Sequence, residues 1–190
     1  LVHGSPQSGS YIRMLWSRAL RKFHVDSLQT IHSILVLGVG GGTVIDLLVT
    51  RFPHAVITAV DIDPTIIKIA RDYFGIDKYP NVRLVCSDAN TFVAQLAKKR
   101  TVFDIVVVDL FIGPKIPGFV SSPKFLGLLH TIIKPCGNLI INYLRELEYQ
   151  EKSDALILRL RIIWEYVEDM KLYNNRFFFA LDKYPLGILR

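Results

Sequence analysis

The amino-acid sequence predicts an α/β fold, a doubly wound and mostly parallel sheet of seven strands that ends in an antiparallel hairpin. Short aliphatic runs alternate along the chain with segments whose apolar residues recur at helical spacing. The run Ile34–Leu37 is followed at once by four glycines within five residues. Strand and helix in alternation indicate a parallel sheet with helices on both faces, and glycines after a strand indicate a ligand crevice.

The first half of the chain contains a lead-in helix and two strand–helix units. Apolar residues recur on one face of Tyr11–Lys22, which indicates a helix. The unbroken aliphatic run Ser33–Leu37 is expected to be a strand covered on both faces, with a helix over Thr43–Arg51. Ala55–Val60 is the second expected strand, and a helix over Pro64–Tyr73 follows because proline suits a first helical turn.

The second half continues the alternation and then changes to a hairpin. Strands are expected at Val82–Cys86, Phe103–Asp109 and Asn138–Tyr143, with helices over Ala89–Lys99, Pro123–Ile133 and Glu146–Ile163. Lys134–Gly137 is expected to be a turn ahead of the fifth strand. The last two strands, near Trp164–Tyr173 and Arg176–Leu181, are joined by a predicted tight turn at Asn174–Asn175. We therefore expect an N-terminal segment with its helix over residues 1–32 and one ligand-binding domain over residues 33–190.

Composition indicates a globular protein of the cytoplasm. The 190 residues are 51% apolar and 21% charged, and no apolar run reaches the roughly 18 residues that cross a bilayer. The net charge of +6 comes from scattered basic residues, which favours a solvated surface over a nucleic-acid face. Cys86 and Cys136 share no metal-type spacing, so we expect buried, reduced thiols and no metal.

Three acidic side chains follow three successive strands of the predicted sheet. Because ligands bind beyond the carboxyl ends of the strands in such a sheet, Asp61, Asp88 and Asp109 are expected at one crevice. Asp61 lies about 20 residues beyond the glycines, where a carboxylate accepts hydrogen bonds from ribose hydroxyls. Asp88, beside Ala89, is placed to accept a hydrogen bond from an adenine amino group. The alternative is a helix cap, by Asp61 or Asp63 at Pro64 and by Asp88 at the next helix.

The glycine spacing separates two classes of nucleotide-binding protein. A nicotinamide dehydrogenase pattern, Gly-x-Gly-x-x-Gly, would need a glycine where Thr43 stands. The pattern Gly38-x-Gly40-x-Gly42 is present in full and resembles the glycine loop of S-adenosylmethionine-dependent methyltransferases of class I. The dehydrogenase alternative is therefore the weaker one.

Longer motifs narrow this resemblance. Val36–Thr43, Ala59–Gly75 and Val85–Ala89 together resemble the spermidine synthase-like group, which holds aminopropyltransferases of polyamine biosynthesis and related methyltransferases. The resemblance implies a Rossmann-like seven-stranded sheet and a bound S-adenosylmethionine or its decarboxylated form. It also implies that Gln7, in Gly4–Tyr11, touches the nucleoside, and that a small N-terminal strand domain precedes Leu1. The candidate donor-binding residues are Gln7, Gly38, Gly40, Gly41, Gly42, Asp61, Ile62, Asp88 and Ala89.

Two departures from the aminopropyltransferases favour methyl transfer. Gly41 stands where those enzymes hold the donor's amino group with an aspartate, and the acids that follow their fourth strand are replaced after Asp109 by Leu110–Ile112. A buried diamine needs carboxylates to balance its charge. We therefore expect a methyltransferase, with aminopropyl transfer and a non-catalytic nucleoside-binding relative as alternatives.

Asp109 is the candidate catalytic residue. It is expected to face the acceptor, as a base, or else to bond backbone N–H groups of the Phe111–Gly118 loop, the expected acceptor wall. The candidate acceptors are a small amine, a protein or an RNA, and a second copy of the chain is considered as a homodimer partner.

Overall fold

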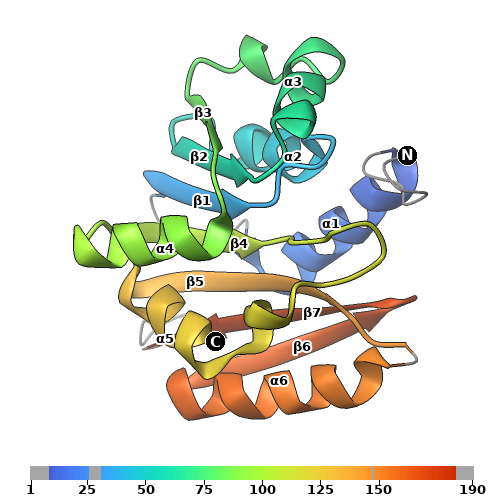
Figure 1. Ribbon diagram of the computed structural model, residues 1–190, viewed down its shortest axis with the longest axis vertical. Helices are drawn as coiled ribbons and strands as arrows, with labels where there is room; N and C mark the ends of the chain where they lie inside the picture. The colour runs from blue at the N-terminus through green and yellow to red at the C-terminus, as the bar shows by residue number, and fades with distance from the viewer. Residues whose placement is uncertain (1–8, 26–30, 147, 183–190) are drawn as a thin grey trace.

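The sheet observed in the computed structural model has seven strands in the order β3-β2-β1-β4-β5-β7-β6 (Figure 1). The structure describes residues 9–25, 31–146 and 148–182. The first five strands pair in parallel, while β7 is antiparallel to both β5 and β6. The predicted α/β class, doubly wound order and C-terminal hairpin are confirmed.

The elements follow the chain in the predicted alternation. The strands are β1 (Ser33–Leu37), β2 (Val56–Asp61), β3 (Val82–Cys86), β4 (Phe103–Val108), β5 (Ile133–Leu144), β6 (Tyr166–Leu172) and β7 (Asn175–Leu181). The helices are α1 (Ser10–Lys22), α2 (Thr43–Arg51), α3 (Pro64–Asp72), α4 (Ala89–Lys98), α5 (Pro123–Thr131) and α6 (Tyr149–Ile163). The short 3₁₀ helices η2 (Ile76–Lys78) and η3 (Gly118–Ser121) lie in the connections.

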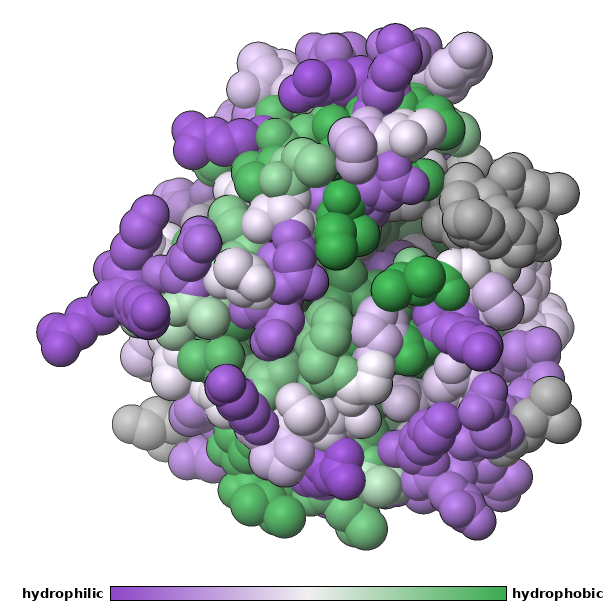
Figure 2. Space-filling model, viewed as in Figure 1, coloured by the Kyte–Doolittle hydropathy of each residue, from purple (hydrophilic) through white to green (hydrophobic). Residues whose placement is uncertain are grey.

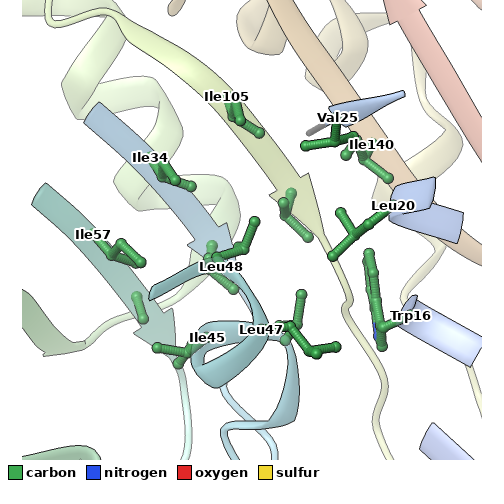
Figure 3. Packing of buried hydrophobic residues seen from close by; sticks show 14 of the residues in the cluster. Trp16, Leu20, Val25, Ile34, Ile45, Leu47, Leu48, Ile57, Ile105 and Ile140 are labelled. Carbon is green, nitrogen blue, oxygen red and sulfur yellow. The ribbon is translucent and has the colours of Figure 1, made fainter. Parts of the chain in front are cut away.

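Two hydrophobic cores sandwich the sheet, because alternate residues of a strand point to opposite faces. Ile34 and Val36 of β1 join the core under α1, α2 and α3, whereas Leu35 and Leu37 join the core under α4, α5 and α6. Figure 3 shows the first of these cores, in which Trp16 and Leu20 of α1 lie near residues of the central strands. Both faces of the central strands are thus buried, as their unbroken aliphatic sequence predicts.

The turn predicted at Lys134–Gly137 lies inside β5. Phe103 of β4 pairs with Ile133, but Ile105 pairs with Asn138, so the intervening residues form an irregularity in the ladder. Cys136 there has a φ of 61°. The strand resumes its pairing after the irregularity, which is why a Lys-Pro-Cys-Gly stretch that reads as a turn does not end the strand.

The hairpin turn also differs from the prediction. It lies at residues 173–174, one position earlier than predicted, and Tyr173 takes the left-handed backbone with a φ of 51°. Asn175 instead pairs with Leu172 in the ladder and is buried. The expectation of buried thiols is wrong as well, because Cys86 and Cys136 are free and exposed. Cys86 ends the edge strand β3, which has a neighbour on one side only.

Candidate functional site

A cleft of about 570 Å³ lies where the carboxyl ends of the parallel strands meet. Figure 2 shows hydrophobic side chains around a hollow in the middle of the molecule's face. The cleft spans the switch in strand order between β1 and β4, where ligands of doubly wound sheets bind. Among the predicted site residues, its lining contains Gly38, Gly40, Asp61, Ile62, Asp88, Ala89 and Asp109.

Two of the remaining predicted donor residues line a different pocket. Gly41 and Gly42 line a second, smaller pocket of about 430 Å³ with Arg13 and Lys78, both of which pair with Asp46. Gln7 lies outside the described residues. Contacts of Gly41, Gly42 and Gln7 with a donor therefore stay predictions.

The glycine loop has a backbone conformation that residues other than glycine rarely adopt. Gly38, Gly40 and Gly42 have φ values of 96°, 49° and 74°. A Cβ at Gly38 would overlap the backbone carbonyl of Asp109, and one at Gly42 would lie 2.6 Å from the side chain of Ile76. The loop thus brings β1 against the end of β4 and leads into the N-terminus of α2, which favours a negatively polarised group.

Asp61 braces the glycine loop from the neighbouring strand. Its Oδ2 accepts a hydrogen bond from the Val39 amide at 2.9 Å, and its Oδ1 accepts one from the Asp63 amide at 3.0 Å. Each carboxylate oxygen can accept a second hydrogen bond, and Asp61 lines the cleft. The residue can therefore hold the loop and still accept from a ribose hydroxyl.

The capping alternatives apply to Asp63 and Asp88. Asp63 caps α3 by accepting from the Thr65 amide at 2.8 Å, and Asp88 caps α4 by accepting from the Thr91 amide at 2.8 Å. Asp88 also lines the cleft beside the buried Ala89. Asp88 can cap the helix and contact a ligand at the same time, because the cap uses Oδ1 and leaves Oδ2 for the ligand.

Asp109 is anchored by two side chains that sequence reasoning did not assign to the site. The Trp16 indole of α1 donates to its Oδ2 at 3.1 Å, and the Asn142 amide of β5 donates to its Oδ1 at 2.8 Å. Both contacts are made by side chains, whereas the alternative role considered for Asp109 was bonding to backbone N–H groups of the loop. Trp16 lies on the apolar face of the predicted lead-in helix, and the one signal for Asn142 is an amide inside an aliphatic strand.

The environment of Asp109 suits a proton acceptor. Burial raises the pKa of this carboxyl to about 6, against the opposing effect of the bonds from Asn142 and Trp16. A carboxylate with a pKa near neutrality takes up and releases a proton more readily than an exposed one does. Because Asp109 also lines the cleft, it can meet a bound acceptor.

The acceptor side of the cleft is mostly apolar. Leu110 and Phe111 pack against the core under α4–α6, and Ile112 is 63% exposed at the rim. The Ile116 amide donates to the Tyr149 hydroxyl at 3.1 Å, which ties this loop to the first residue of α6. Glu146 and Glu148 also line the cleft and were not predicted as site residues.

The described residues contain neither a metal-binding cluster nor a membrane-spanning helix. No three His, Cys, Asp or Glu side chains gather there as metal ligands. None of the helices in the described ranges has the length and apolar character needed to span a membrane.

Comparison with known proteins gives a family match. The family described as "Spermine/spermidine synthase domain" matches residues 15–155. A polyamine aminopropyltransferase of Vibrio vulnificus is 30% identical over 109 residues, which are 57% of this chain and 36% of that protein. A bovine eEF1A lysine and N-terminal methyltransferase is 30% identical over 124 residues, which are 60% of this chain and 18% of that protein. The matched region thus spans about a third or less of these transferases.

Solved structures share the fold. Human methyltransferase-like protein 13, in complex with SAH, has a TM-score of 0.76 at 23% identity and covers 93% of this chain and 83% of its own. A probable spermidine synthase from Corynebacterium glutamicum has the same TM-score of 0.76 at 21% identity and covers 98% of this chain and 70% of its own. The seven-stranded sheet with its terminal hairpin is therefore the class I methyltransferase fold.

Proposed function

The chain belongs to the spermine/spermidine synthase domain family, and from this premise we propose that it is a transferase that uses S-adenosylmethionine to methylate an amine. The glycine loop, Asp61 and the region of Asp88 and Ala89 would bind the nucleoside of the donor. Asp109 would face the acceptor. Relatives in this family include both an aminopropyltransferase and a methyltransferase, so the choice between the two reactions has to come from this chain's own residues.

Donor binding is supported by the chemistry of the cleft. Asp61 follows β2 and can accept from ribose hydroxyls, while the apolar Ile62 and Ala89 suit the faces of an adenine ring. The human neighbour is described in complex with SAH, the demethylated form of the donor. These residues would contact the nucleoside, which both donor forms share.

The observation that favours methyl transfer over aminopropyl transfer is the small number of acidic side chains near the proposed reacting groups. Asp109 is anchored there by two side chains. Gly41, at the position where the family resemblance implies a donor-binding aspartate, has no carboxylate. A sulfonium methyl group moves by in-line displacement, which needs alignment and a deprotonated acceptor. One partly buried carboxylate with a pKa of about 6 meets this need.

Aminopropyl transfer is the second candidate, and Glu146 and Glu148 favour it. Both line the cleft, so the acceptor side carries more negative charge than the segment after Asp109 alone predicts. Both residues are exposed, however. Hydrated carboxylates attract a cationic amine without replacing the buried acids that a desolvated diamine requires. They suit a cationic acceptor in either reaction.

The proposal is tested by parallel incubations with each donor. S-adenosylmethionine labelled in the methyl group is offered with putrescine, with lysine-containing peptides and with peptides that have a free N-terminus. Decarboxylated donor is offered with putrescine. Label transfer to an amine that is lost in Asp109→Asn supports the proposal, and spermidine formation from putrescine would overturn methyl transfer.

A further inference from the structure

Two buried asparagines, both of which also line the cleft, connect Asp109 to the C-terminal hairpin. Asn142 of β5 is 7% exposed and Asn175, at the start of β7, is 9% exposed. The amide nitrogen of Asn175 donates to Asn142 Oδ1 at 2.8 Å, and the amide nitrogen of Asn142 donates to Asp109 Oδ1 at 2.8 Å. Buried amides are costly unless bonded, and these two are bonded in a continuous chain that ends on the carboxylate.

The ionisation of Asp109 sets the orientation of both amides in this series of hydrogen bonds. An ionised carboxylate only accepts hydrogen bonds, so Asn142 has to turn its amide nitrogen toward it. The carbonyl of Asn142 then faces Asn175, which has to present its own nitrogen in turn. Only this orientation of both amides avoids placing two acceptors against each other.

Trp16, near the N-terminus of the protein, bonds the second oxygen of Asp109. Its indole N–H, which can only donate, bonds Asp109 Oδ2 at 3.1 Å. The indole is held edge-on to the ring of Phe177 of β7, with the centroids 5.1 Å apart. Each oxygen of Asp109 therefore accepts an N–H from the protein wall. A proton can be added without breaking these bonds only at the remaining lone pairs.

We propose that Asn142, Asn175 and Trp16 are positioning residues that fix the carboxylate of Asp109 and leave its remaining lone pairs to accept a proton from a substrate in the cleft. This inference rests on the proposed function. The acceptor's nitrogen lone pair forms the new N–CH₃ bond while the electrons of the S–CH₃ bond pass to sulfur, which becomes a neutral thioether. The proton lost by the methylated nitrogen ends on Asp109.

Other titratable groups face the same cleft, and their charges can also act on Asp109. They are Tyr11 of α1, Asp61 after β2, Asp88 before α4, Lys115 in the acceptor loop, and Glu146, Glu148 and Tyr149 near the start of α6. The pKa of Asp109 is raised by burial and lowered by the bonds from Asn142 and Trp16. Removal of either bond should therefore act on Asp109 directly.

The test is a ¹³C NMR titration of the Asp109 carboxyl, which needs no identified acceptor. Asp109→Asn assigns the signal. We expect Asn142→Leu, which loses a bond to a charged group, to raise the titration midpoint by about 1–2 pH units. Asn175→Ala frees the Asn142 amide to rotate and should raise the midpoint by less. Trp16→Phe keeps an aromatic ring against Phe177 and should also raise the midpoint.

Asn138→Leu is the matched control. Asn138 is also a buried asparagine of β5, is 2% exposed, and lies four positions before Asn142. Its replacement should leave the midpoint of Asp109 unchanged. Folding of each variant is checked by thermal unfolding, and Asn175→Ala and Trp16→Phe carry the test if Asn142→Leu does not fold.

The outcomes separate the positioning of Asp109 from the proposed function. Raised midpoints in the site variants, with the control unmoved, support the positioning role of Asn142, Asn175 and Trp16 even when no amine is methylated. Folded site variants whose midpoints equal that of the unmodified protein overturn this role, even when methyl transfer is found. Where an acceptor is found, the acidic limb of the rate against pH should move with the midpoint.

Discussion

At the scale of single residues, the acidic side chains at the strand ends have separate tasks. Asp63 is a helix cap, Asp88 is a cap that also faces the cleft, and Asp61 holds the backbone of the glycine loop. Asp109 alone is held by side chains from two other elements. Position at a strand end therefore predicts where an acid lies but not what it bonds.

Asp61→Ala tests the ribose contact. The substitution removes an acceptor for the donor's hydroxyls, so donor affinity should fall by about 1–3 kcal/mol. Asp63→Ala is the matched control, since it loses the Thr65 cap at a cost of about 1 kcal/mol in stability but should keep donor affinity. Calorimetric titration measures both. Unchanged donor affinity in a folded Asp61→Ala protein would reduce Asp61 to a support of the loop.

The raised pKa of Asp109 predicts a pH dependence of stability. Its pKa in the folded protein, about 6, lies above the ordinary value of 3.8. Its contribution is therefore fully present below about pH 4 and is lost as the pH rises through 6, a change of about 2–3 kcal/mol. The difference in unfolding free energy between the unmodified protein and Asp109→Asn should fall by that amount between about pH 4 and 7, as urea unfolding would measure.

Asp104 provides a control of opposite sign. Burial would raise its pKa, but the bonds from Lys134, His32 and Ser33 outweigh burial and lower it. Its contribution is present above the ordinary value and is lost only as the pH falls below it. The stability difference for Asp104→Asn should stay flat between pH 4 and 7. A flat profile for Asp109→Asn as well would show that Asp109 is not perturbed by burial.

Sequence reasoning identified the acid of the reacting centre but not its partners. The position of Asp109 follows from the end of an aliphatic strand, which is local information. Trp16 and Asn142 bond it from 93 and 33 residues away along the sequence, and Asn175, 66 residues away, bonds Asn142. Only the folded topology brings these residues together. An isolated asparagine in an aliphatic strand is the one signal that was visible beforehand.

At the scale of elements, the glycine loop is the part whose backbone is most constrained by its role. Gly40 has a φ of 49° and lines the cleft. Gly40→Val should abolish donor binding, because the branched side chain occupies the ligand's space or shifts the loop. Gly127→Ala in α5, where a Cβ meets open space, should keep donor binding. Normal calorimetric binding by Gly40→Val would refute the crevice assignment.

The elements themselves were largely predictable, and the differences have local causes. β1 and α2 have the predicted bounds because an aliphatic run and a glycine loop leave little choice. The start of β5 could not be predicted, since pairing with β4 resumes after the irregularity at residues 134–137. The hairpin turn lies one residue earlier because the ladder and the contact with Asn142 retain Asn175 in β7.

At the scale of the whole molecule, the single sheet runs from β3 to β6 (Figure 1), and residues from both of its halves line the cleft. The strands β1–β3 present the candidate donor residues, while β4, β5 and β7 present Asp109 and the side chains around it. The C-terminal hairpin thus serves the site as well as the fold. Asn175→Ala in this hairpin should raise the pKa of Asp109, which lies on the other side of β5 and is connected to Asn175 through Asn142.

The most direct test of the account is a calorimetric titration of the protein with S-adenosylmethionine and with its decarboxylated form, side by side. The assignment of methyl transfer predicts binding of S-adenosylmethionine and no preference for the decarboxylated form. Both forms carry the amino group, and Gly41 offers no side-chain carboxylate that would repel the carboxylate which S-adenosylmethionine alone retains. Tighter binding of the decarboxylated form would contradict the assignment of methyl transfer.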